Sequence, residues 1–399
     1  MNFILFDAEI RDHLLPLTYT RPCAELRVGI MTIREKWEHV LGAEVSHITQ
    51  DYLSRKYPLT VTDDNVIING TLLPDPMLKR QICDLAMDEA LLDGDKLVAA
   101  RLTGEQFNKL VNEQDIDQLQ GFNYEEPYVG LERPHDIFTY NGKAIEADFE
   151  RLTKGRTSHP LSDTNTVIGD PSRIFLEAGA RVECAILNTQ NGPIYVGRDA
   201  EIMEGCIVRG GLAMCEHSVL KLGAKVYGPT TLGPYCKVGG EVNNCVFQAY
   251  SNKGHDGFMG NSVIGEWCNI GADSNTSNLK NNYAEVKLWD YVNRRFMPTG
   301  LQFCGLIMGD HSKCGINTMF NTGTVVGVSC NIYGAGFPRN YVPSFMWGGA
   351  AGTKEYRFDK AMETAEIMMK RRNIDLDGTE REMLTAVFEQ TQEHRPKRS

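Results

Sequence analysis

Three features that would point to particular classes of protein are missing from this sequence. Its 11 cysteines are scattered and form no Cys-x-x-Cys pair, so neither a disulfide framework nor a zinc site is expected. Positive charge is not in excess, since the formal net charge is −11, which argues against a nucleic-acid partner. No apolar run of about 18 residues occurs, and no cationic leader precedes an apolar core at the start. The sequence therefore predicts reduced thiols, no membrane span and a cytoplasmic location.

The first 155 residues have the pattern of an α/β layer. Short apolar runs at 2–6 and 65–70 predict buried strands. Residues 31–41 and 75–92 carry apolar side chains at helical spacing, which predicts two helices. Because strands alternate with helices, we expect an α/β domain over residues 1–155.

From about Val167 onward, apolar residues recur every six positions. This period fits neither a helix nor a simple strand, but it is typical of a parallel β-helix in which each turn contributes inward apolar residues. Glycine often follows the periodic residue and provides the backbone freedom that a tight corner needs. The series are Ile168, Ile174, Ala180, Ile186; Val196, Ile202, Val208; Leu220, Val226, Leu232, Val238; Ile264, Ile270; and Met308, Cys314, Phe320, Val326, Ile332.

The six-residue period is interrupted once and then ends. Between about Leu279 and Gly305 it is lost, and a loop inserted into a solenoid is a common place for binding. Beyond Gly352 the chain has the pattern of two amphipathic helices, the second beginning near Thr379. The expected organisation is thus an α/β domain at 1–155, a β-helix at 165–348 and C-terminal helices at 353–394.

The coil resembles a known family around "NKGHDGFMGNSVIGEWCNIGADSNTSNLK" and "MGDHSKCGINTMFNTGTVVGVSCNIYG". The similarity is to the bifunctional N-acetylglucosamine-1-phosphate uridyltransferase/glucosamine-1-phosphate acetyltransferases, in domain order as well as repeat type. It implies a left-handed parallel β-helix with hexapeptide repeats, preceded by a sugar nucleotidyltransferase-like domain. It also implies a homotrimer, acetyl-CoA as co-substrate, and a sugar phosphate or sugar nucleotide of cell-envelope metabolism as partner.

The resemblance assigns roles to several residues of the coil. The family's glycine-histidine pair falls on Gly254 and His255, which makes His255 the catalytic base. An asparagine that the family uses near the amino sugar falls on Asn269, and a later asparagine of the family falls on Asn278; both would orient the sugar or the acetyl group. The remaining assignments are Lys280 as one candidate for the sugar phosphate, alongside Lys225, Lys287 and Arg294, and the amides near Gly271 and Gly315 as candidates for the CoA arm.

The chemistry of His255 can also be argued without the family. Acetyl transfer to an amine requires the amine to be deprotonated, and imidazole, with an ordinary pKa of about 6.5, is suited to that task. Backbone amides at a coil corner can stabilise the oxyanion that develops on a thioester. Local context by itself favours an ordinary histidine in a surface turn, and the resemblance favours the catalytic role. His217 and His311 are expected to face solvent in variable positions of the repeat.

Two coil positions depart from the family pattern. Phe258 stands where the family often places an aromatic hydroxyl three residues after the histidine, so a hydrogen bond to substrate is lost. Asn243 occupies a place where the family has a phosphate-binding lysine. The phosphate ligands are therefore left open.

The front half carries part of a nucleotidyltransferase signature in "RDHLLPLTYTRPCAELRVG", which includes Arg11 and Arg21. The phosphate-binding parts are missing. "FDAEIRDH" replaces the glycine-rich loop, Cys23 replaces a lysine, and Thr71 stands where the family's magnesium-binding aspartate belongs. Uridylyl-type transfer by the usual route is therefore not expected, although Asp7, Asp12, Asp63 or Asp75 could rebuild a magnesium site.

These observations lead to three hypotheses. The first is an acetyl-CoA-dependent acyltransferase that acts on an amino-sugar phosphate or a sugar nucleotide, with His255 as general base. The second is a sugar-1-phosphate nucleotidyltransferase that uses Arg11, Arg21 and magnesium. The third is a non-catalytic scaffold that binds sugar nucleotides.

Overall fold

The computed structural model describes residues 1–113 and 119–396, which form two compact units. The first comprises Met1–Leu14, Arg21–Leu26 and Met31–Glu132. The second comprises Leu15–Thr20, Arg27–Ile30 and the chain from Arg133 onward. The long helix α5 (Asp136–Thr153), which the sequence pattern places before the coil, therefore groups with the coil.

The first unit is built on a six-stranded mixed sheet in the order β2-β1-β3-β6-β5-β7. β1 runs parallel to both β2 and β3, and β6 runs antiparallel to β3 and β5. The two strands predicted from apolar runs are present as β1 and β3. The strands are β1 (Asn2–Phe6), β2 (Val45–Ile48), β3 (Asn65–Asn69), β5 (Glu89–Asp93), β6 (Lys96–Leu102) and β7 (Gln120–Asn123), with β4 (Leu72–Leu73) and β8 (Val129–Gly130) as a separate pair. The helices are α1 (Ile33–Leu41), α2 (Asp51–Ser54), α3 (Pro76–Asp84) and α4 (Gly104–Glu113).

One predicted helix is only half helical. Residues 75–84 do form α3, capped by the Asp75 carboxylate, which accepts hydrogen bonds from the amides of Met77 and Leu78. The second half of the predicted helix instead becomes β5, which pairs with β6 on one side and β7 on the other. A short apolar run fits a helix or a buried strand equally well, and here the partner strands decide.

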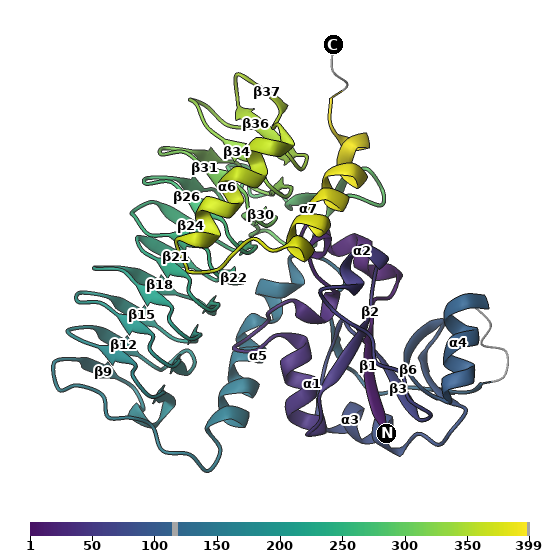
Figure 1. Ribbon diagram of the computed structural model, residues 1–399. Helices are drawn as coiled ribbons and strands as arrows, with labels where there is room; N and C mark the ends of the chain where they lie inside the picture. Colours follow the sequence, from purple (N-terminus) through teal and green to yellow (C-terminus); the bar gives the residue numbers. More distant parts are fainter. Residues whose placement is uncertain (114–118, 397–399) are drawn as a thin grey trace. The chain divides into compact units, whose positions relative to one another are not determined.

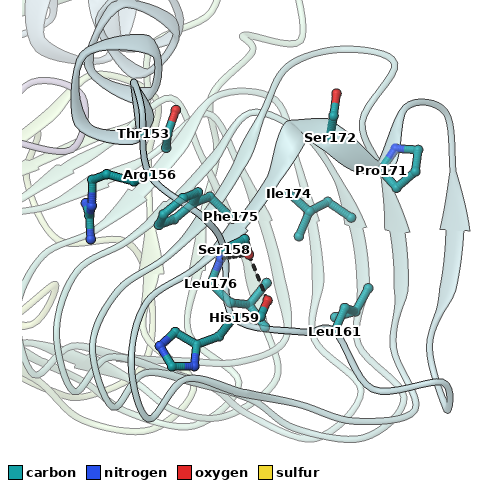
Figure 2. A pocket seen from close by; sticks show the side chains of 10 residues that line it. All are labelled: Thr153, Arg156, Ser158, His159, Leu161, Pro171, Ser172, Ile174, Phe175 and Leu176. Carbon is teal, nitrogen blue, oxygen red and sulfur yellow. Dashed lines mark hydrogen bonds between the residues drawn. The ribbon is translucent and has the colours of Figure 1, made fainter.

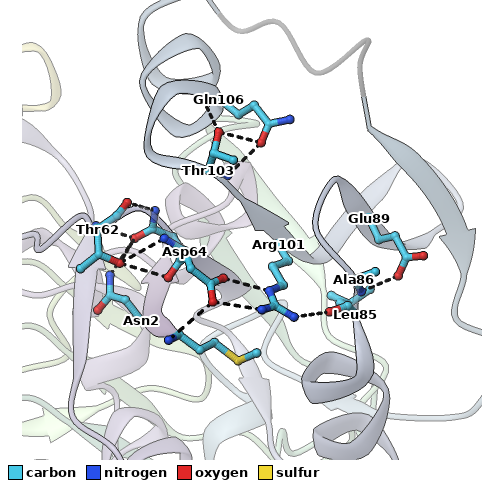
Figure 3. A network of polar contacts seen from close by, with 11 residues as sticks. Asn2, Thr62, Asp64, Leu85, Ala86, Glu89, Arg101, Thr103 and Gln106 are labelled. Atoms are coloured by element: carbon cyan, nitrogen blue, oxygen red, sulfur yellow. Dashed lines mark hydrogen bonds and ion pairs between the residues drawn. The ribbon is translucent and has the colours of Figure 1, made fainter.

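A polar network joins the start of β3 to the strand beside it. The Asp64 carboxylate accepts two hydrogen bonds from Arg101, at 2.9 and 3.0 Å, and the same guanidinium donates to the carbonyl of Leu85 (Figure 3). These contacts join the two central strands of the sheet to the segment that follows α3.

The second unit is a parallel β-helix with three sheets, one for each side of the coil (Figure 1). Its successive strands pair in parallel with strands one turn away, as the six-residue period predicts. The nine-stranded sheet contains β10 (Ile174–Leu176), β13 (Ile194–Val196), β16 (Leu212–Met214), β19 (Thr230–Leu232), β22 (Val246–Phe247), β25 (Val263–Ile264), β30 (Leu306–Met308), β33 (Thr324–Val326) and β35 (Tyr341–Val342). The ten-stranded sheet contains β11 (Arg181–Val182), β14 (Glu201–Ile202), β17 (Val219–Leu220), β20 (Lys237–Val238), β23 (Asn252–Lys253), β26 (Asn269–Ile270), β31 (Lys313–Cys314), β34 (Asn331–Ile332), β36 (Met346–Gly349) and the antiparallel β37 (Gly352–Glu355). The eight-stranded sheet contains β9 (Thr166–Ile168), β12 (Ile186–Asn188), β15 (Ile207–Arg209), β18 (Lys225–Tyr227), β21 (Glu241–Asn243), β24 (Phe258–Gly260), β27 (Asn275–Thr276) and β32 (Met319–Phe320).

Most of the residues in the periodic series are buried in the coil interior, but two residues of the first series are not. From Val196 to Val238 every sixth residue is buried in the apolar core, and the same holds from Met308 to Ile332. Ile168 and Ile186, however, are 41% and 39% exposed, and Leu187 points inward in place of Ile186. A shift by one residue along a strand moves a side chain to the opposite face. The six-residue spacing by itself therefore does not show whether Ile186 or Leu187 points inward.

A column of stacked rings lies along the corner that precedes the ten-stranded sheet. The rings of His217, Tyr235, Tyr250, Trp267 and His311 follow one another with centroid separations between 4.2 and 6.3 Å. All five residues have positive φ angles, between 53° and 60°, because the same corner recurs in each turn. The expectation of a solvent-facing His311 is wrong, since it is 4% exposed and its Nε2 lies 4.0 Å from Glu380. His217, at the open end, keeps 38% of its side chain exposed.

Two glycines at equivalent corners give a matched test of the coil's packing. A Cβ on Gly271 would lie 2.4 Å from the backbone carbon of Gly315, whereas a Cβ on Gly254 would meet nothing within 4 Å. We expect Gly271→Ala to lower the free energy of unfolding by about 1–3 kcal/mol and Gly254→Ala to change it by less than about 0.5 kcal/mol. Urea unfolding of both variants measures this difference, and equal stabilities would contradict the packing.

The insertion and the C-terminal helices follow the sequence prediction. The coil stops after β27 and resumes at β30, and the segment between them forms a hairpin of β28 (Lys287–Asp290) and β29 (Arg295–Pro298). The last part of the chain forms α6 (Phe358–Lys370) and α7 (Gly378–Gln390), drawn in yellow in Figure 1. Among the described residues, no helix has the length and apolarity that crossing a bilayer requires.

Candidate functional site

His255 lies in the turn that connects β23 of the ten-stranded sheet to β24 of the eight-stranded sheet. Its side chain is exposed, and its imidazole forms no hydrogen bond with the described residues. The turn itself is constrained by Gly257, which has a φ of +113° and packs where a Cβ would lie 2.2 Å from the carbonyl oxygen of Ser274. The backbone is therefore held while the ring is left open to an incoming group.

A lysine inside the coil holds the same turn. Lys253 is 2% exposed, and its ammonium donates hydrogen bonds of 2.9 Å to the carbonyl oxygens of His255 and Gly239. Burial lowers the pKa of Lys253 to about 8, since a charged form is disfavoured away from water. Sequence analysis missed this residue. The signal was present, because Lys253 stands six residues after Phe247 and six before Met259, both of which point into the core.

Asn269 lies on the same sheet as the strand that leads to His255. It pairs in register with Asn252 on one side and Lys313 on the other, and its side chain is exposed. Lys313 donates to the carbonyl oxygen of His311 at 2.8 Å, and burial lowers its pKa to about 8. Asn269 therefore lies on β26, next to β23, whereas His255 lies in the turn that follows β23.

Asn278 and Lys280 lie at the next corner, beyond β27 of the eight-stranded sheet. The Asn278 amide donates to the side-chain oxygen of Asn261 at 2.8 Å. The Lys280 ammonium donates to the carbonyl oxygen of Glu285 at 2.6 Å, within the inserted loop. Both side chains therefore have structural partners in the isolated chain.

The two candidate glycines for the CoA arm form part of the coil's own hydrogen-bond ladder. The amide of Gly271 donates to the carbonyl oxygen of Cys314, and that of Gly315 donates to the carbonyl oxygen of Ile332. A Cβ on Gly271 would lie 2.4 Å from the backbone of Gly315, so the stacked coil itself fills the space beside Gly271. A role of these glycines in holding the CoA arm stays a prediction.

The replacement for the glycine-rich loop in the first unit is a closed polar cluster. The Asp7 carboxylate accepts from the amide of Cys23 at 2.7 Å and from the Thr49 hydroxyl at 2.6 Å, and it lies 3.4 Å from Arg11. Arg11 also donates to the Tyr52 hydroxyl at 2.8 Å. Burial works to lower the pKa of Arg11, but the charges of Tyr52 and Asp7 outweigh it and raise the pKa. These groups are hydrogen-bonded or ion-paired to one another. Burial also raises the pKa of the Cys23 thiol.

Other parts of the predicted triphosphate site are also buried or engaged. Arg21 is 3% exposed, and Thr71 donates its hydroxyl proton to Asn69. Asp75 caps α3. Within residues 1–113 and 119–396, no three His, Cys, Asp or Glu side chains gather as a metal site would require.

Part of the signature sequence belongs to the coil's unit. The amide and carbonyl of Arg27 both bond the side chain of Gln248, at 2.7 and 3.3 Å. The Thr20 hydroxyl donates to the buried carboxylate of Asp310 at 2.8 Å. Hydrogen bonds therefore hold these short segments against the coil.

A pocket of about 450 Å³ lies near the first turns of the coil (Figure 2). Its charged wall is already paired, since Arg156 donates to both carboxylate oxygens of Glu177 and lies over the ring of Phe175. His159 also lines the pocket. None of the catalytic or binding residues predicted from the sequence is among its lining residues.

Residues 3–157 match the family described as sugar nucleotidyl transferase. This span corresponds to the predicted α/β domain at 1–155, and bifunctional GlmU proteins recur among the curated relatives. This part of the chain is therefore similar to sugar nucleotidyl transferases. The bifunctional protein GlmU of Methanocaldococcus jannaschii is 33% identical over 90 residues, which are 23% of this chain and 21% of that protein. A bifunctional sugar-1-phosphate nucleotidylyltransferase/acetyltransferase of Sulfurisphaera tokodaii is 28% identical over 144 residues, 36% of this chain and 35% of the relative.

The chain matches only about a fifth to a third of the length of these relatives. Among solved structures, an Arabidopsis UDP-N-acetylglucosamine acyltransferase aligns with 59% of this chain and 91% of its own, at 15% identity and a TM-score of 0.28. The polySia-specific acetyltransferase NeuO aligns with 52% of this chain and 99% of its own, at 11% identity and a TM-score of 0.26.

Proposed function

We propose that this chain transfers an acetyl group from acetyl-CoA to the amine of an amino-sugar phosphate or of a nucleotide-linked amino sugar. The observation that carries the proposal is the turn at His255, whose backbone is held by Lys253 from inside the coil while the imidazole stays open. A general base must reach an incoming substrate, so an exposed ring on a constrained backbone is the arrangement required.

The reaction then follows from the chain's own groups. A neutral His255 imidazole takes a proton from the neutral sugar amine as the amine nitrogen bonds to the thioester carbonyl carbon. The carbon–sulfur bond breaks, and the CoA thiolate leaves and takes up the proton that the imidazole holds. Asn269, exposed on the neighbouring strand, orients the sugar, and Asn278 and Lys280 serve a ligand only by exchanging their present partners.

A homotrimer would complete the site. Ile186 and Ile207 lie opposite each other in register on the outer face of the eight-stranded sheet, 39% and 45% exposed. Exposed apolar side chains gathered on one sheet face favour contact with another copy of the chain. In such an assembly a neighbouring coil would form the second wall of the acyl-donor site beside His255.

Nucleotidyl transfer is the second candidate because residues 3–157 match the sugar nucleotidyl transferase family. It would use Arg11, Arg21 and a magnesium ion held by aspartates. The Asp7 and Arg11 cluster must open before either residue could meet a triphosphate, so we rank this function second.

One set of assays separates acyl transfer, nucleotidyl transfer and a non-catalytic scaffold. Purified protein is given acetyl-CoA with glucosamine 1-phosphate and, in parallel, a nucleoside triphosphate, magnesium and several sugar 1-phosphates. We expect thiol release in the first reaction and no pyrophosphate in the second. Pyrophosphate release would favour the nucleotidyltransferase, and ligand binding with neither product would favour a scaffold in envelope-polysaccharide metabolism.

A further inference from the structure

Four positive charges gather where the end of α6 meets the ten-stranded sheet. Lys221 follows β17, Lys237 begins β20, and Arg371 and Arg372 follow α6. Burial lowers the pKa of Lys237, and the charges of Arg372, Lys221 and Arg371 lower it further. Lys221, Arg371 and Arg372 therefore lie within electrostatic reach of Lys237, on a chain whose net charge is −11.

No described carboxylate neutralises this cluster by an ion pair. None of the four forms a salt bridge with an acidic residue among 1–113 and 119–396. Glu201 acts on Lys237, but its carboxylate is already paired with Arg181 at 3.2 Å. Gathering like charges costs free energy unless an anion binds among them.

The cluster adjoins the strand that leads to His255. Arg372 donates to the side-chain oxygen of Asn252 at 3.0 Å, which fixes the guanidinium over the sheet. Asn252 pairs in register with Lys237 on one side and with Asn269 on the other. The cluster thus lies against the strand that leads to the turn carrying the open imidazole.

We propose that Lys221, Lys237, Arg371 and Arg372 form a binding site for a phosphate group of a substrate. The proposal rests on the proposed acyl transfer for the identity of that substrate. The phosphate belongs either to coenzyme A or to the phosphorylated sugar, since both carry the required charge. Arginine and lysine side chains on two elements give a phosphate several charge-assisted hydrogen bonds. The candidates considered from sequence, Lys225, Lys287 and Arg294, lie elsewhere: on the eight-stranded sheet, on β28 and beside β29.

Calorimetric binding to the full-length chain tests the site without relying on turnover. The ligands are coenzyme A, its form without the 3′-phosphate, glucosamine 1-phosphate and glucosamine. We expect the double variant Lys237→Met, Arg372→Met to bind one phosphorylated ligand at least about tenfold more weakly, since a charged hydrogen bond contributes roughly 1.5–3 kcal/mol. The ligand that is affected identifies the source of the phosphate.

The matched control is Lys225→Met, which removes an exposed lysine from the eight-stranded sheet. It should keep the wild-type dissociation constant within about twofold. Wild-type affinity in the double variant for every phosphorylated ligand, with an unchanged melting temperature, would overturn the site. An inactive protein that still shows the charge-dependent binding would overturn acyl transfer and leave the phosphate site standing.

Discussion

His255→Ala should reduce acetyl transfer by about 10²- to 10⁴-fold, the range that a positioned general base contributes. The melting temperature should stay the same because the side chain is exposed and forms no hydrogen bond with the described residues. Thiol release from acetyl-CoA in the presence of the amino sugar measures the effect. The loss should fall on kcat, with little change in KM for acetyl-CoA, since the imidazole acts on the proton and does not bind the coenzyme.

The control for this variant is His39→Ala, which removes an exposed histidine from α1. It should retain full activity. Acetyl transfer that survives His255→Ala would exclude this residue as the base. Loss of activity in both variants would point instead to damage that has no connection with the turn.

Lys253→Met should remove a large pH dependence of stability. The pKa of Lys253 is lowered from 10.5 to about 8 in the folded protein, so the unfolded chain holds more protons between those two values. The free energy of unfolding of the wild type therefore rises as the pH increases through this window, by roughly 3 kcal/mol, and the charge penalty is fully present below pH 8. The methionine variant has no such group and should lack this contribution.

Urea unfolding of the two proteins at pH 7 and at pH 10.5 gives the comparison. Lys313 has a similarly lowered pKa, but it contributes equally to both proteins and cancels in the difference. Lys225→Met, on the outer face of the coil, should follow the wild type at both pH values. Parallel behaviour of wild type and Lys253→Met would mean that the ammonium is not confined as the structure shows.

The repeat could be recognised from sequence because it is local and redundant. Every turn of the coil repeats the same inward position, so many residues report one geometry and a few errors do not hide it. The phase was wrong only in the first series, where Ile186 faces outward and Leu187 inward. The segment after α3 was mistaken for helix because its strand partners, β6 and β7, cannot be seen in a local pattern.

The site was only partly accessible from sequence. The resemblance selected Asn269, which lies on β26, and His255, which lies in the turn after the neighbouring strand β23. It also grouped Asn278 and Lys280 with them, although these lie at the next corner of the coil. Lys253 was overlooked because a lysine is seldom expected at an inward position. His311 was expected in solvent, but C-terminal residue Glu380 and the ring of Trp267 lie beside it.

The sequence by itself determined that this chain forms an α/β domain followed along the chain by a hexapeptide-repeat coil, because apolar residues recur at a fixed spacing that a local pattern reveals. Only the tertiary structure decided what the corners of that coil can do. It brought the cations after α6 beside Lys237, although more than 130 residues separate them in the sequence, and it showed that the Lys253 ammonium bonds the backbone of the His255 turn. Contacts at such separations depend on how turns stack and helices return, and no local pattern specifies them.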